Sequence, residues 1–395
     1  MDIRQLADAH IANTYARFPL ALVKGQGCTV WDDQGRAYVD FIAGIAVCNL
    51  GHCHPDLAAT LAEQARTLWH VSNLYYTAPQ AELAAWLTAH SFADRVFFAN
   101  SGAEANEAAI KLARKYFKDR GAPERYRVVS MKQSFHGRTM ATLSATGQEK
   151  VRKGYDPILE GFDYAAFNDI EELSCLVGPA TCAIMLEPIQ GEGGVVVPDR
   201  EYLVQVRRLC DETGCLLIYD EIQTGIGRTG KLFAYEHFGV APDILTLAKA
   251  LGNGLPIGAM LATEQAAAAF VPGAHASTFG GTPLVTAVAL KVLQILTGEG
   301  VLERVAETGA YLRGHLERLQ SKHPVIKDIR GMGLLIGARM DTPGAPIVRA
   351  CMEQGYLINC IQDNILRFAP PLIVTPAEID GLMACLDNVL SGMEQ

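Results

Sequence analysis

Two apolar runs, each followed directly by a charged residue, constrain the fold of this chain most strongly. The first, residues 216–219, is followed by Asp220, and the second, residues 244–248, is followed by Lys249 and a glycine-rich turn. Such runs are typical of buried parallel strands. Because ligands bind at the carboxyl edge of open α/β sheets, we expect Asp220 and Lys249 to face one site there.

An acid and a lysine at that edge suit a particular cofactor. Pyridoxal phosphate is bound through a Schiff base to a lysine, and its pyridine nitrogen takes an acidic partner. Taken alone, this stretch leaves a second interpretation open, because a lysine after a strand is commonly a solvated surface group. The motifs elsewhere in the chain decide between the two.

The composition limits the classes of function. With 395 residues, the chain is long enough for a large core and two lobes. The net charge is −9 and no basic block occurs, which argues against a nucleic-acid partner and a polybasic membrane anchor. No apolar segment approaches the roughly 20 residues of a membrane span, and no secretory signal is evident. The ten cysteines lack a CxxC motif, so we expect reduced thiols and a soluble, cytoplasmic protein.

The segment CNLGHCHP, residues 48–55, suggests a metal site at first sight. Zinc sites usually draw on two well-separated ligand pairs, and no second cluster of cysteine and histidine follows. We therefore predict no metal here. The segment instead favours a turn that leads into a helix with Pro55 in its first turn.

A short apolar run, residues 96–99, leads through a turn of small residues into an apolar helical stripe. Ser101, Gly102 and Ala103 stand at the start of that helix, where free backbone N–H groups bind anions such as phosphate. The alternative is a plain strand-to-helix turn with Ser101 as its N-cap. The glycine spacing matches neither G-x-G-x-x-G nor a Walker loop, which weakens nucleotide binding as an explanation.

Three further segments carry candidate side chains. Phe135 is suited to lie against a planar ring, and Arg138 is suited to bind a carboxylate through two hydrogen bonds. A core aromatic and a surface ion pair are the alternatives for these two. The acids and glycines of residues 187–194 indicate either an active-site rim or a solvated loop, and Arg367 adds another arginine near the C-terminus.

Together these motifs resemble the class III pyridoxal-phosphate aminotransferases. The matching segments occur in the order of that family through nearly the whole chain: NSGAEANEAAIKLAR, SFHGRT, LEPIQGEGG, DEIQTGIGRTG, STFGGTP and LRFAPPL. The resemblance implies the α/β architecture of fold-type I, in which a large domain carries a mostly parallel seven-stranded sheet. A small α+β domain is then built from both chain ends, and two subunits share their active sites as a homodimer. We place the large cofactor-binding domain at residues 56–285 and the small domain at residues 1–55 and 286–395.

The resemblance also implies a role for each residue near the cofactor. Lys249 resembles the Schiff-base lysine, which also carries the proton between substrate and cofactor. Asp220 resembles the acid that keeps the pyridine nitrogen protonated. Gln223 is similar to the residue beside the phenolic oxygen, and Phe135 matches the aromatic that stacks on the ring.

Phosphate binding is implied for two separate segments. Ser101, Gly102 and Ala103 resemble the cradle for the cofactor phosphate. Thr278 is expected to reach the phosphate of the neighbouring subunit, and Ser277 is expected near the substrate. No metal is implied.

The family offers an account of substrate binding as well. The counterpart of Arg138 holds the distal carboxylate of either substrate, and that of Arg367 binds the α-carboxylate of glutamate or 2-oxoglutarate. The counterpart of Glu192 neutralises that second arginine when an uncharged chain takes its place. The physics is consistent, because a buried arginine without a partner is costly.

The activity that the resemblance implies is transfer of the δ-amino group of N2-acetylornithine to 2-oxoglutarate, which gives N-acetylglutamate 5-semialdehyde and glutamate in arginine biosynthesis. Thr29 and Ile45 stand where ornithine-specific members carry tyrosines, which fits an acylated α-nitrogen. Succinylornithine, ornithine and 4-aminobutyrate are the alternative amine donors, and a semialdehyde aminomutase is a related alternative. From other classes, a catalytically inactive sensor and a nicotinamide dehydrogenase are considered; the latter lacks its glycine fingerprint.

Overall fold

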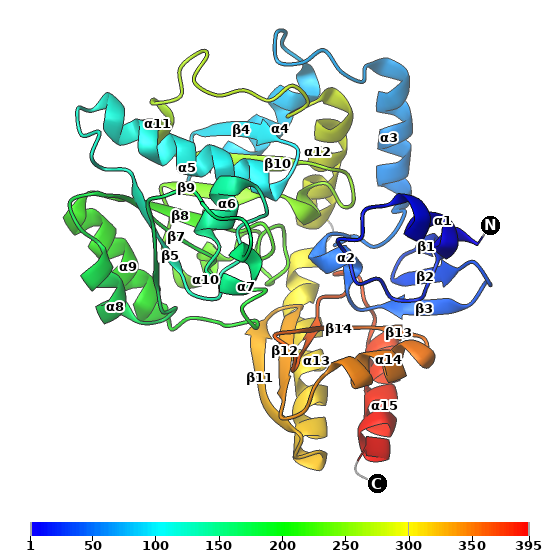
Figure 1. The fold of residues 1–395 in the computed structure, drawn as a ribbon. Coiled ribbons are helices and arrows are strands. Elements are labelled where there is room, and N and C mark those ends of the chain that lie inside the picture. The colour runs from blue at the N-terminus through cyan, green and yellow to red at the C-terminus, as the bar shows by residue number, and fades with distance from the viewer. Residues whose placement is uncertain (1, 299, 394–395) are drawn as a thin grey trace.

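A seven-stranded sheet lies at the centre of the computed structural model, which describes residues 2–298 and 300–393 (Figure 1). The strand order is β4-β10-β9-β8-β7-β5-β6. The bounds are β4 (Arg95–Ala99), β5 (Arg127–Met131), β6 (Phe162–Ala165), β7 (Thr181–Leu186), β8 (Leu216–Asp220), β9 (Ile244–Leu247) and β10 (Gly258–Ala262). Only β10 runs antiparallel to its neighbours within this sheet. The prediction of a mostly parallel seven-stranded sheet is confirmed.

Helices cover both faces of this sheet, because its central strands are apolar on both sides. Successive residues of β7 and β8 alternate between two buried clusters: Ile184 and Leu217 pack with α9, while Ala183 and Ile218 pack with α5. This double burial explains why the strands read as continuous apolar runs in the sequence. The helices of this region are α5 (Gly102–Asp119), α6 (Met140–Ala145), α7 (Glu149–Arg152), α8 (Ile170–Leu176), α9 (Arg200–Thr213), α10 (Tyr235–Phe238) and α11 (Glu264–Ala267).

The two chain ends build smaller sheets beside the central one (Figure 1). One has the order β1-β2-β3-β13 and the other β11-β12-β15-β14. Their bounds are β1 (Leu22–Gln26), β2 (Thr29–Asp32), β3 (Ala37–Asp40), β11 (Ile326–Met332), β12 (Leu335–Met340), β13 (Tyr356–Leu357), β14 (Asn359–Ile361) and β15 (Ile365–Phe368). Since β13 pairs with β3, the C-terminal part of the chain completes an N-terminal sheet. The predicted boundaries after residues 55 and 285 stay predictions.

The remaining helices belong to the chain ends and to the junction between them and the large sheet. They are α1 (Ile3–His10), α2 (Ala43–Ala46), α3 (Pro55–Thr67), α4 (Ala78–Ala89), α12 (Pro283–Gly298), α13 (Val301–Lys322), α14 (Ala345–Glu353) and α15 (Pro376–Met393). Helix α3 begins at Pro55, as the sequence predicts. Within the described residues, no single helix has the length and hydropathy of a membrane span; α12 and α13 reach them only together, across a 69° bend.

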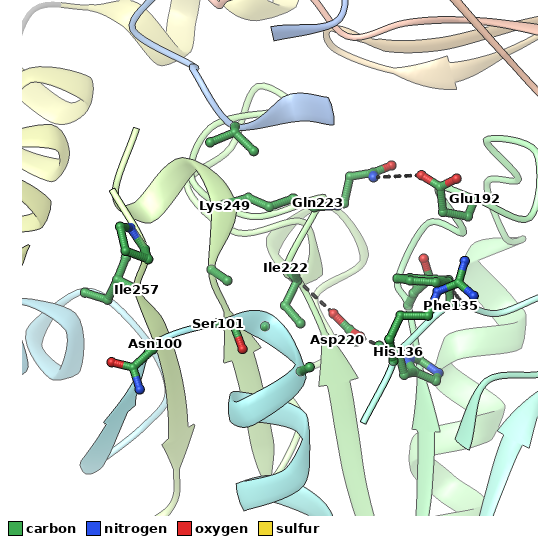
Figure 2. A pocket seen from close by; sticks show the side chains of 18 of the residues that line it. Asn100, Ser101, Phe135, His136, Glu192, Asp220, Ile222, Gln223, Lys249 and Ile257 are labelled. Carbon is green, nitrogen blue, oxygen red and sulfur yellow. Dashed lines mark hydrogen bonds and ion pairs between the residues drawn. The ribbon is translucent and has the colours of Figure 1, made fainter. Parts of the chain in front are cut away.

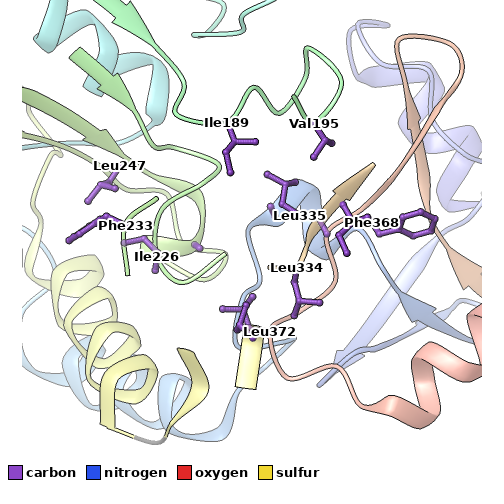
Figure 3. Close-up of a cluster of buried hydrophobic side chains, with 14 of the residues drawn as sticks. Ile189, Val195, Ile226, Phe233, Leu247, Leu334, Leu335, Phe368 and Leu372 are labelled. Atoms are coloured by element: carbon purple, nitrogen blue, oxygen red, sulfur yellow. The ribbon is translucent and has the colours of Figure 1, made fainter. Parts of the chain in front are cut away.

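One hydrophobic cluster joins the large sheet to the C-terminal strands (Figure 3). Ile189 and Val195, from the loop after β7, lie opposite Leu335 of β12, and Ile226 belongs to the same cluster. Because cores of this kind are packed to crystal-like density, they hold the elements they join in a fixed relation. The loop of residues 187–196 and the strand that carries Arg367 are therefore positioned by shared packing.

Candidate active site

The carboxyl ends of β8 and β9 bring Asp220 and Lys249 into one cavity of about 470 Å³ (Figure 2). Asp220 ends β8 opposite Thr246 of β9, and Lys249 opens the short 3-10 helix η1 (Lys249–Leu251) after that strand. Nine residues predicted for the site line the cavity: Ser101, Gly102, Ala103, Phe135, Arg138, Glu192, Asp220, Gln223 and Lys249. The parallel strand order thus places the acid and the amine at the same edge.

The side chain of Lys249 lies where its charge is disfavoured. Burial lowers the pKa of Lys249 to about 8, and the negative charge of Glu192 opposes this shift without reversing it. The backbone of Lys249 has a left-handed φ of 44°, a strained conformation of the kind that clusters at functional sites. An amine that loses its proton near neutral pH can act as a nucleophile and as a base.

Asp220 is buried and held by three polar neighbours. Its Oδ2 atom lies 2.7 Å from both Asn106 Nδ2 and His136 Nδ1, and its Oδ1 accepts the backbone N–H of Ile222 at 3.0 Å. Asn106 is fixed in turn, because its Oδ1 accepts the hydroxyl of Thr246 at 2.7 Å. A carboxylate oriented in this way is ready to pair with a cationic group.

The N-terminus of α5 lines one side of the cavity (Figure 2). Ser101 caps this 18-residue helix, since its side chain accepts the backbone N–H of Glu104 at 3.2 Å. The N–H groups of Gly102 and Ala103 belong to the first turn, which has no intrahelical acceptors, and so they are available to an anion. A Cβ atom on Gly102 would lie 2.7 Å from Ile222 Cδ1, so a larger residue here would displace the Ile222 side chain, which also lines the cavity. The N-cap interpretation of Ser101 is confirmed, and the phosphate-binding role of this turn stays a prediction.

Phe135 and Arg138 form another wall of the cavity. The guanidinium of Arg138 lies 5.5 Å from the centre of the Phe135 ring, and no carboxylate among the described residues forms an ion pair with it. Buried Glu187 also lines the cavity, and it accepts the N–H of Phe135 at 3.2 Å and that of Gly191 at 3.1 Å. Burial raises the pKa of Glu187 to about 7. Glu187 thus ties the aromatic wall to the loop that carries Glu192.

Arg367 of β15 is buried and forms an ion pair with Glu192 through Nη1 and Oε1. Gln223 contacts both partners, with its Oε1 3.4 Å from Arg367 Nη1 and its Nε2 3.5 Å from Glu192 Oε1. Burial alone would raise the pKa of Glu192, but the charges of Arg367 and Lys249 outweigh it and hold that pKa below its usual value. Arg367 itself does not line the cavity, whereas its ion-pair partner Glu192 does.

Like Arg367, the predicted residues Ser277 and Thr278 do not line the cavity of this chain. Ser277 reaches it only indirectly, since its Oγ accepts a hydrogen bond from Asn100 Nδ2 at 3.2 Å, and Asn100 lines the cavity. Thr278 is exposed and does not line it. The structure therefore leaves the role of Thr278 toward a neighbouring subunit as a prediction.

Three residues around Asp220 received no role in the sequence analysis: Asn106, His136 and Thr246. Asn106 did leave a signal, because it is an amide on the buried and otherwise largely apolar face of α5. His136 lies within a quoted motif, and its Nε2 is buried without a hydrogen-bond partner among the described residues. Thr246 left no signal, since threonine is ordinary in a buried strand.

The donors and acceptors of this cavity fit pyridoxal phosphate. The start of α5 offers N–H groups to a phosphate, the cavity presents a flat ring at Phe135, and Asp220 presents a fixed carboxylate. Lys249 supplies an amine whose pKa of about 8 makes the neutral form accessible. Each of these features matches a different part of that cofactor.

Comparisons with known proteins give the family. A model of the family described as "Aminotransferase class-III" matches residues 10–390. The chain belongs to the class III aminotransferases. As a member of this family the protein is a transaminase, as the sequence predicts. The class III aminotransferases depend on pyridoxal phosphate.

This aminotransferase is 56% identical to the acetylornithine aminotransferase of Caldanaerobacter subterraneus subsp. tengcongensis, over 97% of each chain. It is 53% identical to the acetylornithine aminotransferase of Gloeobacter violaceus, over 99% of this chain and 98% of the other. These matches extend over both the large sheet and the chain ends.

Solved structures agree with the fold of this aminotransferase. The N-acetylornithine aminotransferase of Stenotrophomonas maltophilia is 39% identical and aligns with a TM-score of 0.85 over 99% of each chain. An ornithine aminotransferase of Toxoplasma gondii, described with partial occupancy of PLP at the protein active site, is 35% identical. It aligns with a TM-score of 0.95 over 99% of this chain and 94% of that one. The prediction of fold-type I is confirmed.

Proposed function

We propose that this aminotransferase transfers the δ-amino group of N2-acetylornithine to 2-oxoglutarate, giving N-acetylglutamate 5-semialdehyde and glutamate in arginine biosynthesis. One observation carries the proposal: among the residues that the structure describes, Arg138 lines the cavity without an ion-pair partner, whereas a second arginine, Arg367, is covered by Glu192. That set suits alternation between a substrate with one carboxylate and a substrate with two. Relatives at 48–56% identity that bear the name acetylornithine aminotransferase support it.

The cofactor in this proposal is pyridoxal phosphate. When the cofactor is bound, Gly102 and Ala103 would hold its phosphate, Phe135 would contact its ring, Asp220 would pair with its pyridine nitrogen, and Lys249 would supply the amine for its aldehyde. When bound, the cofactor supplies a cationic ring that withdraws electrons from the carbon bearing the transferred amine. The three hydrogen bonds to Asp220 keep that carboxylate in the orientation needed.

Lys249 moves the proton in both half-reactions. Its amine lies at the carboxyl edge of the sheet, inside the cavity, and its pKa of about 8 places the proton exchange near neutral pH. Positioned acid–base transfer of this kind contributes roughly 10²–10⁴-fold in rate. Burial of the amine keeps its charge disfavoured.

The two arginines distinguish the substrates by the number of carboxylates that each substrate carries. N2-acetylornithine carries one carboxylate and an uncharged amide, so Arg138 holds the carboxylate while Glu192 stays on Arg367. Glutamate and 2-oxoglutarate carry two carboxylates, so Glu192 must leave Arg367 to admit the second. The pairing of Arg367 with Glu192 thus corresponds to the form that receives the amine donor.

The assembly in this proposal is a homodimer with shared active sites. Residues 68–76 expose several large apolar side chains, among them Trp69 and Tyr76. This segment packs against the loop that bears Thr278: Asn73 Nδ2 donates to Ser277 O at 2.9 Å. An exposed apolar surface beside an exposed loop of predicted function is what a subunit interface requires.

The cytoplasm is the proposed location of the enzyme. All ten cysteines are free thiols in the structure. This supports a reducing compartment, where thiols stay unpaired.

A titration of the two half-reactions tests the function. The purified yellow holoenzyme is mixed separately with N2-acetylornithine, N2-succinylornithine, ornithine and 4-aminobutyrate, without a keto acid, and the cofactor absorbance is followed. We expect N2-acetylornithine to bleach the visible band fastest and 2-oxoglutarate to restore it. A faster reaction with another amine would identify that amine as the donor instead of N2-acetylornithine. An unchanged band with all four amines would favour an inactive ligand sensor as the function.

A further inference from the structure

Residues 43–46 form a left-handed turn close to the active site. The four consecutive φ angles are 50°, 65°, 69° and 59°, and only one of these residues, Gly44, is a glycine. Left-handed turns of this length are rare because the Cβ atom crowds the following carbonyl. Ile45 is β-branched, which makes a positive φ a genuine outlier, and its side chain is 46% exposed. Burial of Ile45 therefore does not explain the conformation.

Two side chains hold the entrance of this turn. Asp40 accepts the backbone N–H of Ile42 at 2.8 Å and that of Ala43 at 2.9 Å through Oδ1, and its Oδ2 lies 2.8 Å from His52 Nε2. His52 is fixed by a pair of backbone hydrogen bonds with Gly27, at 2.8 and 3.0 Å. We refer to Asp40 and His52 as the clamp. His52 belongs to the CNLGHCHP segment, for which the catalytic roles give no account.

The exit of the turn is tied to the catalytic loops. Val47 follows the turn and lines the active-site cavity together with Lys249. Beyond it, the N–H of Leu50 donates to Asn253 Oδ1 at 2.8 Å, in the loop after Lys249, and Asn49 Nδ2 donates to Ile226 O at 2.7 Å. In Figure 2 the N-terminal segment, drawn in blue, crosses the side of the cavity where Lys249 lies. The turn is thus held at both ends, and Val47 lies between the two anchors.

We propose that Asp40 and His52 are positioning residues for the amine donor: they hold residues 43–46 in the left-handed turn, and the turn sets Val47 as the wall against which the carbon chain of the donor lies. The inference rests on the proposed function, since it takes the donor to be an ω-amino compound with an aliphatic chain. Strain retained at such a site marks a conformation that the surrounding structure enforces.

The clamp acts on the substrate only through the turn. Asp40 and His52 do not line the active-site cavity; with Gly44, they line a separate, mostly apolar cavity of about 400 Å³ beneath the turn. Without the Asp40 carboxylate, the N–H groups of Ile42 and Ala43 lose their acceptor and the left-handed φ values lose their support. The turn then relaxes toward conformations that its alanine and isoleucine residues prefer, and Val47 moves with it.

The test compares holoenzyme variants by steady-state kinetics and thermal melting. The variants are Asp40→Ala, His52→Gln, which keeps the acceptor for Ile42 and Ala43, and the double variant Asp40→Ala/Ala43→Gly. The matched control is Asp33→Ala, which removes an exposed acid from the same hairpin. The donor is whichever of the four amines the wild type converts fastest, so a wrong substrate assignment leaves this test intact.

We expect Asp40→Ala to raise the KM of the donor about tenfold or more while kcat at saturation stays within about threefold, and His52→Gln to give a smaller rise. Glycine at position 43 adopts a positive φ without the clamp, so Ala43→Gly should return the KM of Asp40→Ala to within about threefold of the wild type. Asp33→Ala should leave KM unchanged. A purely structural role would lower the melting temperature of Asp40→Ala and His52→Gln without a change in KM, and that result would overturn the proposal. A raised KM in Asp40→Ala that Ala43→Gly does not reduce would overturn it as well.

Discussion

Glu192 covers Arg367 at the edge of the active-site cavity, and Gln223 contacts both side chains. No other carboxylate among the described residues forms an ion pair with Arg367, which is buried. Removing one member of a buried ion pair leaves an uncompensated charge, which is far more costly than the pair is favourable. The pair is therefore suited to open only when a substrate carboxylate replaces Glu192.

Replacement of Glu192 should affect the two half-reactions unequally. In Glu192→Ala, Arg367 has no partner when N2-acetylornithine binds, so the rate of the donor half-reaction should fall about tenfold or more. Glutamate brings its own carboxylate to Arg367, and its half-reaction should change by less than about threefold. Single-turnover absorbance measurements with each substrate check this, and equal losses in both half-reactions would exclude the switching role.

The amine of Lys249 should titrate near pH 8. Its pKa is lowered from the ordinary 10.5 to about 8 by burial, and Glu192 limits the shift. In the cofactor-free enzyme, the rate at which Lys249 reacts with an amine-selective reagent should therefore rise with pH with a midpoint of about 8. Glu192→Gln removes the charge that favours the ammonium, so the midpoint should move below 8. A midpoint near 10.5 in the wild type would contradict the burial of this amine.

The same shift predicts how stability depends on pH. Because the folded-state pKa of Lys249 lies below its unfolded value, its buried charge destabilises the fold fully below pH 8, and this cost disappears as pH rises from 8 to 10.5. Lys249→Met should raise the free energy of unfolding of the cofactor-free enzyme by about 3 kcal/mol at pH 7. Denaturant unfolding should show that difference shrinking above pH 8. A difference that grows with pH would have the wrong sign for a buried ammonium.

The catalytic edge of the sheet was predictable because local patterns encode it. Strands β8, which ends at Asp220, and β9, which ends at Leu247, are buried on both faces. Each therefore appears in the sequence as a largely apolar run, and the charged residue that follows the run marks the strand end. The start of α5 was predictable for a similar reason, since small residues between an apolar run and an apolar helical stripe, with Ser101 as a capping residue, mark where the helix begins.

Other features depend on contacts between distant segments and left no local pattern. Three of the four residues of the left-handed turn are alanine or isoleucine, which have no preference for positive φ, and the contacts at its entrance come from Asp40 and the more distant His52. In the sequence, Ile3, Leu6, Ala7, Ile11 and Tyr15 follow helical spacing, which predicts a first helix that reaches Tyr15, but α1 ends at His10. No residue of α1 is buried, so no packing extends that helix.

The hydrogen bonds behind Asp220 predict a measurable coupling. Asn106→Ala removes a donor to Asp220 and leaves the hydroxyl of Thr246 without its acceptor, at a cost of about 1–3 kcal/mol for each buried group left unpaired. Thr246→Val removes the other end of the same bond. Urea unfolding of both single variants and the double variant should therefore give losses that are not additive. Additive losses would show that Asn106 and Thr246 act independently, and the two buried groups would then have other partners.

The last prediction concerns the glycine that precedes Glu192. A Cβ atom on Gly191 would lie 1.9 Å from Gln223 Oε1 and 2.6 Å from its Cδ, so Gly191→Ala must displace Gln223, which contacts both members of the Arg367–Glu192 pair. The matched control is Gly178→Ala, where a Cβ atom would meet nothing within 4 Å. We expect Gly191→Ala to lower kcat/KM for both substrates at least about tenfold, with Gly178→Ala unchanged. Because Gly191 also donates its backbone N–H to Glu187, a smaller loss in Gln223→Ala than in Gly191→Ala would assign the remainder to movement of the loop itself. Equal activity of Gly191→Ala and the wild type would mean that Gln223 has no fixed position in the working enzyme.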